Sequence, residues 1–428
     1  MADDAAATAV APATAGPGSR RGDRPELLVQ ISMVAVIVAV VAGAVVFSWF
    51  NRRLAIPDPT TWEPGRLVTA TFDPPTNKVE LFHNQGDGQF YVHMAQDPFL
   101  RQPERIQGGP SEQAYRLQRP LYGWVGWALT LGDAGRAAWV MVGLTVASVA
   151  ALAAVVAALA ARLGRSPMWG LAILGFPGIH VDLLRCGPEA LGTALLGLAL
   201  LALAPAWRVG PWGVDRHRLS SRRLVASLLC FALAGLTRES FLAVPVVLSA
   251  VWWWQTRARR SVSAGGWFRS WGWPLVSVVP FLVWVVVLRL ALGAWSQGSG
   301  GGEELAGERM ASVPFGGLVD ALSAWRVGEA LSLLLIVGPA LLGVVRSRSL
   351  EWRSLIAVHV GLSATFGFVV WYTWVGFSRV LLPLSLVGLL ANPLVLPVQP
   401  AVMVMGGLAV LVGLVWAPLG QVFAWAAW

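Results

Sequence analysis

The chain has 428 residues, of which 56% are hydrophobic and only 13% are charged, and its mean hydropathy is +0.62. A soluble domain carries about 25% charged residues, so this composition excludes an ordinary soluble protein and predicts an all-α, multi-spanning membrane protein. The net charge is +9, and Lys78 is the only lysine among 32 basic residues. Because the arginines gather between apolar runs, they fit membrane topology signals better than nucleic-acid binding.

The N-terminal third contains a tail, one apolar helix and a long polar loop. Residues 1–26 are rich in Ala, Asp, Pro and Gly and predict a disordered cytoplasmic tail. The apolar run at 27–50 is long for a signal-peptide core and predicts a retained membrane helix. Residues 51–136 form a long polar first loop, in which the apolar stretch 121–132 is short for a span and predicts an interfacial or re-entrant helix.

Most of the remaining chain reads as helices joined by short loops. Further spans are predicted near 137–161, 168–184, 188–205, 223–236, 240–254, 273–294, 328–345, 355–375, 379–395 and 400–417. With the first helix they make about eleven crossings, arranged as a transmembrane unit over 27–395 and a C-terminal helix with a short tail in 396–428. The Gly-rich segment 295–310 follows no strand and opens no helix, so it predicts a flexible external loop rather than a phosphate loop.

The arginine distribution predicts an orientation. If the N-terminus is cytoplasmic and 121–132 does not cross, seventeen arginines outside the first loop face the cytoplasm and five face the opposite side. This bias agrees with the positive-inside rule. The chain is therefore predicted to be a multi-pass protein of the cell membrane with its first loop on the external face. Its richness in Arg, Ala and Gly indicates a bacterium with a GC-rich genome.

Charged side chains mark the predicted external turns. Asp87 lies in the first loop within GDGQFY, and the later turns carry His180, Asp182, Arg185, Glu189, Arg238, Glu239 and Arg379. Polar groups at membrane depth are costly and usually pair or line a cavity. We therefore expect one external pocket in which Asp87, Arg238 and Arg379 lie within about 10 Å of one another.

These residue types suit chemistry on a lipid phosphate. The planar guanidinium group of arginine donates two parallel hydrogen bonds to a phosphate and stays charged. A carboxylate beside it can take a proton from an attacking hydroxyl group. The pattern thus fits transfer of a group from a lipid-linked phosphate.

Several segments resemble a known family. NQGDGQFYVHMAQDPF (84–99) and AYRLQRPLYGWVGWALTLG (114–132) resemble the first-loop signature of GT-C-type membrane glycosyltransferases, and LTRESFL (236–242) and GFSRVLLPL (376–384) resemble later elements of bacterial members. The resemblance implies a GT-C-like bundle that moves a mannose-like sugar from a polyprenyl-phosphate donor to a cell-envelope glycan, glycolipid or protein. It implies Asp87 as the general base of an inverting transfer, and substrate contacts from Gln89, Tyr91, Arg119, Arg185, Glu189, Arg238, Glu239 and Arg379.

The first loop departs from the family pattern in one respect. Many members carry paired acids there, whereas Gly86 and Gly88 flank Asp87 in this chain. The second acid is therefore absent or supplied by Asp97. We predict no cofactor and no obligatory metal, with the divalent-metal requirement left open by this departure.

Each of these residues also has a structural interpretation. Asp87 suits a turn, Asp97 a helix cap, and Arg379 a snorkelling position at lipid headgroups. Neighbouring charges could simply neutralise or bond each other, as in the pairs Arg238–Glu239 and His180–Asp182. His359 suits a satisfied core position, and the tyrosines at 91, 115 and 122 could anchor at the membrane interface instead of contacting sugar.

Two other functions fit parts of the sequence. A transporter or flippase of lipid-linked envelope intermediates would also need an arginine-lined cavity. Such proteins commonly show internal repeats with broken helices in matched positions, and no convincing repeat is visible here. A non-catalytic membrane scaffold leaves the external charges unexplained.

Overall fold

The computed structural model describes residues 24–53, 77–84, 87–103, 106, 110–204, 220–257, 272–295, 313–325, 327–347 and 349–391. Within these ranges the regular structure is helical and contains no strand, in agreement with the predicted all-α class. The predicted tail as far as residue 23, the glycine-rich loop at 296–310 and the helix at 400–417 lie outside the described residues.

The first half of the chain contains one long helix, a group of short first-loop helices, and then the start of the bundle. In order these are α1 (Arg24–Arg53), α2 (Lys78–Asn84), α3 (Gly88–Gln96), α4 (Pro110–Leu117), α5 (Pro120–Thr130), the 3-10 turn η2 (Ala134–Arg136), α6 (Ala137–Arg162), the 3-10 segment η3 (Pro167–Gly175), α7 (Pro177–Arg185) and α8 (Glu189–Leu203).

The second half continues the bundle with helices of mixed length. In order these are α9 (Ser221–Thr237), η6 (Glu239–Leu242), α10 (Ala243–Arg257), η8 (Trp273–Val278), α12 (Val279–Leu292), α14 (Gly316–Ala321), η9 (Leu322–Ala324), α15 (Val327–Arg346), α16 (Leu350–Ala364), α17 (Phe368–Trp371), α18 (Trp374–Val380) and α19 (Leu382–Ala391).

Four helical stretches in the described residues are long and apolar enough to cross a membrane. They are Pro25–Ser48, Ala134–Arg162, Trp273–Leu292 and Val327–Arg346. Each coincides with a span predicted from the sequence. Apolar side chains on the outside of these helices stay exposed, for example Leu290 of α12 and Val345 of α15. Such apolar faces suit contact with lipid. A helix also satisfies its backbone polar groups internally, as the membrane interior requires.

Two further apolar regions are broken rather than straight. η3 and α7 meet at a bend of 70°, and α18 and α19 meet at a bend of 55°, so the membrane could be crossed up to six times if each pair is one span. Pro177 opens α7 after Phe176, which has an extended backbone (ψ 119°). Proline disfavours helical backbone in the residue before it, and this accounts for the first bend. The predicted number of about eleven crossings is not confirmed.

Some predicted helix boundaries differ from the structure. α16 ends at Ala364 and α17 begins at Phe368, so the continuous span predicted at 355–375 is wrong. The helix α8 is apolar but has only 15 residues. α1 begins at Arg24, three residues before the predicted start of the first helix, and thus takes in the end of the predicted tail.

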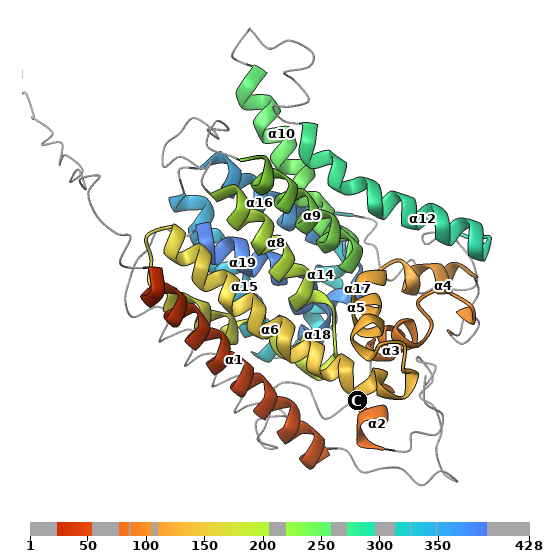
Figure 1. Cartoon of the computed structure of the whole chain (residues 1–428). Helices are drawn as coiled ribbons and strands as arrows, with labels where there is room; N and C mark the ends of the chain where they lie inside the picture. The colour runs from red at the N-terminus through yellow and green to blue at the C-terminus, as the bar shows by residue number, and fades with distance from the viewer. Residues whose placement is uncertain are drawn as a thin grey trace, which may run out of the picture.

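A small second core fixes the first loop to the bundle. Tyr91 and Met94 of α3 pack with Tyr122 of α5 and Met141 of α6 in this cluster. The Tyr122 hydroxyl lies 2.6 Å from the Thr145 hydroxyl of α6. Figure 1 shows α3, α4 and α5 gathered at one end of the bundle, beside the start of α6. The helices α3 and α5 of the first loop are therefore a packed part of the fold, in a position to carry a site.

A close backbone contact holds α18 against α7. A Cβ atom added to Gly178 would lie 2.4 Å from the carbonyl oxygen of Ser378. We expect Gly178→Ala to separate the two helices and to lower stability by about 1–3 kcal/mol, the usual range for overpacking. The measurement is the apparent melting temperature of the purified protein in detergent.

Gly143 of α6 supplies the matched control, since a Cβ there would meet no atom within 4 Å. Gly143→Ala should leave the melting temperature unchanged or raise it, because alanine favours a helix by up to about 1 kcal/mol over glycine. Equal melting temperatures for the two variants would show that the contact between α7 and α18 is not tight.

Candidate functional site

Asp87 sits directly in front of α3, at the position that usually caps a helix. Its backbone carbonyl accepts a hydrogen bond from the amide of Phe90 (3.0 Å), but its side chain makes no capping bond. A Cβ on the next residue, Gly88, would lie 2.6 Å from the carbonyl oxygen of Arg185. Gly88 thus lets the start of α3 lie directly against the end of α7. The Asp87 carboxylate is left to point at other partners.

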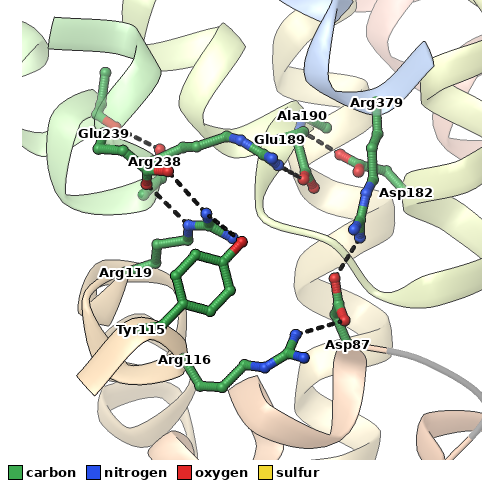
Figure 2. Close-up of polar contacts among 12 residues, drawn as sticks. Asp87, Tyr115, Arg116, Arg119, Asp182, Glu189, Ala190, Arg238, Glu239 and Arg379 are labelled. Carbon is green, nitrogen blue, oxygen red and sulfur yellow. Dashed lines mark hydrogen bonds and ion pairs between the residues drawn. The ribbon is translucent and has the colours of Figure 1, made fainter. Parts of the chain in front are cut away.

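Those partners are two arginines from distant segments. Arg379 of α18 donates to Oδ2 of Asp87 (2.5 Å), and Arg116 of α4 donates to Oδ1 (3.3 Å) (Figure 2). The Arg116 guanidinium also lies over the Phe90 ring, 4.5 Å from its centroid. The side chain of Asp87 is 24% exposed. Both carboxylate oxygens are therefore engaged by guanidinium groups at a partly open position.

The charge state of Asp87 follows from these contacts. Burial opposes ionisation, but the guanidiniums of Arg379 and Arg116 outweigh it and hold the pKa of the Asp87 carboxyl well below its usual range. A negative charge at the first turn of α3 is also favoured by the helix dipole. Asp87 is therefore an anion at neutral pH, and a weak base while both arginines hold it.

Two further ion pairs, Arg119–Glu239 and Arg238–Glu189, lie near Asp87 and form a second layer of the site. Arg119 donates from Nε and Nη2 to the two carboxylate oxygens of Glu239, at 2.9 and 2.8 Å. Arg238 donates to Glu189, which is 1% exposed. The sequence neighbours Arg238 and Glu239 therefore have different partners, as Figure 2 shows, and the interpretation in which they neutralise each other is wrong.

A pair of carboxyl groups completes this layer. The amide of Ala190, at the start of α8, donates to Oδ2 of Asp182. The other oxygen of Asp182 and Oε2 of Glu189 each lie 2.4 Å from the point where a Cβ on Gly187 would stand. These two oxygens are thus close neighbours, and only glycine fits between them. The turn from α7 to α8 is shaped by the carboxyl groups that it carries.

The structure brings together most of the predicted site residues. Asp87, Arg119, Glu189, Arg238, Glu239 and Arg379 form three ion pairs that lie within electrostatic range of one another (Figure 2). Arg185 is half-buried and lies within electrostatic range of Asp87 and Arg379. Gln89 and Tyr91 are buried in this state, at 0% and 3% exposed, so their predicted contacts with substrate stay predictions.

Other polar residues have purely local roles. Asp97 accepts hydrogen bonds from the amides of Arg101 (2.9 Å) and Gln102 (2.7 Å), so it stabilises the turn after α3 instead of supplying a second acid beside Asp87. His180 bonds the carbonyl of Leu174 (2.9 Å), not Asp182. His359 bonds the carbonyl of Leu355 within α16, as expected for a core histidine.

Sequence reasoning missed Arg116, and it weighed Tyr115 only as a sugar contact or an interface anchor. Arg116 contacts Asp87, and the hydroxyl of Tyr115 lies 3.5 Å from Arg119. Both lie in AYRLQRPLYG, where Arg116 and Arg119 are three residues apart. Residues three apart lie on one face of a helix, so this spacing predicts that Arg116 and Arg119 point to the same side. No group of three or more His, Cys, Asp or Glu side chains in the described part of the chain could hold a metal ion.

Comparisons with family models, with curated proteins and with solved structures find no match to this chain. The site must therefore be interpreted from its own geometry. It contains a partly open carboxylate and several guanidinium groups. It lies in a helical bundle whose outer faces suit contact with lipid.

The Arg119–Glu239 pair tests how much the network stabilises the fold. Glu239 is 33% exposed, so breaking the pair should cost less than the about 3–5 kcal/mol of a fully buried one. We expect Arg119→Gln or Glu239→Gln alone to lower the free energy of unfolding by about 2 kcal/mol. The double variant should lower it by less than the sum of the two single effects. Thermal unfolding of the four proteins measures this coupling.

The exposed pair Arg136–Asp133 is the control, because its side chains are 73% and 48% exposed. Arg136→Gln should cost less than about 1 kcal/mol. If Arg119→Gln is as mild as this, the bidentate contact does not stabilise the fold.

The ion pairs of Asp87 predict a pH dependence of stability. A carboxyl whose folded-state pKa is depressed stabilises the fold above its unfolded pKa of about 4 and loses that contribution as the pH falls below it. The difference in melting temperature between wild type and Asp87→Asn should therefore be largest above about pH 5 and shrink below about pH 4. A difference that stays constant down to pH 3 would contradict this assignment.

Proposed function

We propose that the protein is a membrane glycosyltransferase of the GT-C type, which transfers a mannose-like sugar from a polyprenyl-phosphate donor to a cell-envelope acceptor. The observation that carries the proposal is the contact of Asp87 with Arg116 and Arg379, two guanidiniums brought from α4 and α18. An acid and several arginines at one end of an apolar bundle suit a substrate with a lipid tail and a phosphate. The resemblance of the first loop to that family points the same way.

In the proposed reaction, Asp87 acts as the general base. The Asp87 carboxylate takes the proton of the acceptor hydroxyl while that oxygen forms a bond to the anomeric carbon. The bond from the anomeric carbon to the phosphate oxygen breaks, and polyprenyl phosphate leaves with the electron pair. Attack opposite the leaving group inverts the anomeric centre. Arg379, in the same place, can stabilise the charge that develops on the phosphate.

The second layer has a supporting role in this proposal. Arg119 and Arg238 are satisfied by Glu239 and Glu189 and are each 7% exposed, so they hold the turns of the site in position. The proposal also includes the finer features expected from the sequence: a GT-C-like arrangement with about eleven crossings, an external first loop, a cytoplasmic N-terminus and a bacterial cell membrane.

Sugar transfer by Asp87→Asn tests the proposal. Removing a general base typically costs about 10²–10⁴-fold in rate. We expect that loss when purified protein in lipid nanodiscs is given a polyprenyl-phosphate sugar, labelled in the sugar, with envelope glycan and glycolipid fractions as acceptors. Unchanged transfer by the variant would reject Asp87 as the base.

Asp97→Asn is the matched control, since Asp97 lies at the far end of the same helix and its side chain accepts hydrogen bonds from the amides of the following turn. It should retain transfer within a few-fold of wild type. If wild type moves the donor lipid between vesicle leaflets and never transfers sugar, the flippase alternative replaces the glycosyltransferase.

A further inference from the structure

In this structure the ion pairs of Asp87 oppose its use as a general base. Arg379 and Arg116 occupy the two oxygens of the Asp87 carboxylate. A carboxylate with a strongly depressed pKa takes a proton poorly, because deprotonating a hydroxyl needs a base of suitable strength. One of the two ion pairs must therefore loosen before Asp87 can act.

Two guanidiniums at this position have unused donors. Arg379 bonds Asp87 through Nη1, and its Nε atom is buried with no hydrogen-bond partner in the described part of the chain. No ion pair or hydrogen bond is found for the neighbouring Arg185 among the described residues. The backbone of Arg185 lies close to Gly88, the residue after Asp87, and the Arg185 guanidinium is within electrostatic range of the Asp87 carboxylate. Together, Arg185 and Arg379 present free donors suited to a phosphate group.

Arg116 has aromatic contacts in addition to its ion pair with Asp87. Its guanidinium lies over the Phe90 ring at 4.5 Å and near the Tyr115 ring at 5.5 Å. Such contacts favour a guanidinium that stays in place. Arg379, with its unsatisfied Nε, is therefore the partner that an incoming anion would take.

We infer that Arg379 exchanges partners: a phosphate monoester or diester that binds between Arg185 and Arg379 draws the Arg379 guanidinium away from Asp87 and leaves that carboxylate held by Arg116 alone. This inference rests on the proposed function for its catalytic consequence. The exchange leaves no charge stranded, because phosphate replaces the carboxylate as the counterion of Arg379. The base is then released only when a phosphate-bearing donor is present.

The groups facing Asp87 keep its carboxylate ionised after Arg379 has moved away. Arg116 keeps one ion pair, and Arg119 and Arg185 lie within electrostatic range. With one guanidinium fewer, the pKa of the Asp87 carboxyl moves back toward its ordinary value. Tyr91, whose phenol is buried and neutral, adds no competing charge at neutral pH. Donor binding and base activation are thereby coupled through a single side chain.

Binding of labelled farnesyl phosphate, a short polyprenyl phosphate, tests the exchange without sugar or acceptor. If Asp87 competes with phosphate for Arg379, Asp87→Asn should bind farnesyl phosphate about 10-fold more tightly than wild type, equivalent to about 1.4 kcal/mol. In an Arg379→Gln background the same substitution should change affinity by less than about 2-fold. Arg185→Gln should weaken binding, and farnesol, which lacks the phosphate, should not respond to Asp87→Asn.

Two results would overturn the inference. Asp87→Asn could tighten binding equally with and without Arg379, which would show only a general effect of removing negative charge. It could instead weaken binding, which would show that Asp87 supports the ligand. Asp133→Asn removes a distant carboxylate and should leave affinity unchanged. Inorganic phosphate is the third ligand: a response equal to that of farnesyl phosphate would assign the site to free phosphate and reject lipid phosphate as the trigger.

A conservative variant, Arg379→Lys, distinguishes misfolding of Arg379→Gln from the loss of the positive charge at this position. Arg379→Lys keeps the charge, so it should restore at least part of the effect of Asp87→Asn on affinity if Arg379→Gln abolished it by charge loss. Coupling in the binding cycle without any sugar transfer by wild type would reject the glycosyltransferase and keep the exchange. Transfer that depends on Asp87, with no coupling in the cycle, would reject the exchange and keep the glycosyltransferase.

Discussion

The ion pair between Asp87 and Arg379 joins the first loop to α18, and the arrangement of the site depends on it. In a molecule with so few charges, most buried charges are paired, because an unpaired one is costly. The fold brings charged groups together by placing the start of α3 next to the end of α7 and by packing α7 against α18 and α8 against α9. Glycine makes the first two contacts possible, at Gly88 and Gly178, where a side chain would meet backbone atoms.

The network has two parts with different properties. The part formed by Arg119, Arg238 and their carboxylate partners consists of closely paired charges and acts as a frame. The part around Asp87 is more open, with 24% exposed side chains on both Asp87 and Arg379 and with donors still available. Enzyme sites commonly combine a rigid support with a few groups whose interactions can change on binding. This division explains why the same charge type has a structural role at one position and a proposed chemical role nearby.

The sequence predicted the long apolar helices and the gathering of charged turns, because hydropathy and the cost of polar groups at membrane depth both leave clear local signals. It did not predict the bends before Pro177 and near Leu381, since a hydropathy window does not detect a change of direction. Nor did it predict which acid pairs with Arg238. Adjacent residues after a helix point in different directions, so Arg238 reaches Glu189 and leaves Glu239 to Arg119. Pairing of this kind is set by tertiary packing.

The order of the chain gives the Asp87–Arg379 pair a consequence for biosynthesis. The two residues are 292 positions apart. At a synthesis rate of about 5–20 residues per second, roughly 15–60 s pass between the emergence of the carboxylate and the arrival of this arginine. During that interval Arg116, which follows 29 positions after Asp87, is the only one of the two guanidinium partners already made. Chains that stop before α18 would keep Arg116 as the partner of Asp87 but would lack the second guanidinium, so the first loop would not be tied to the end of the bundle.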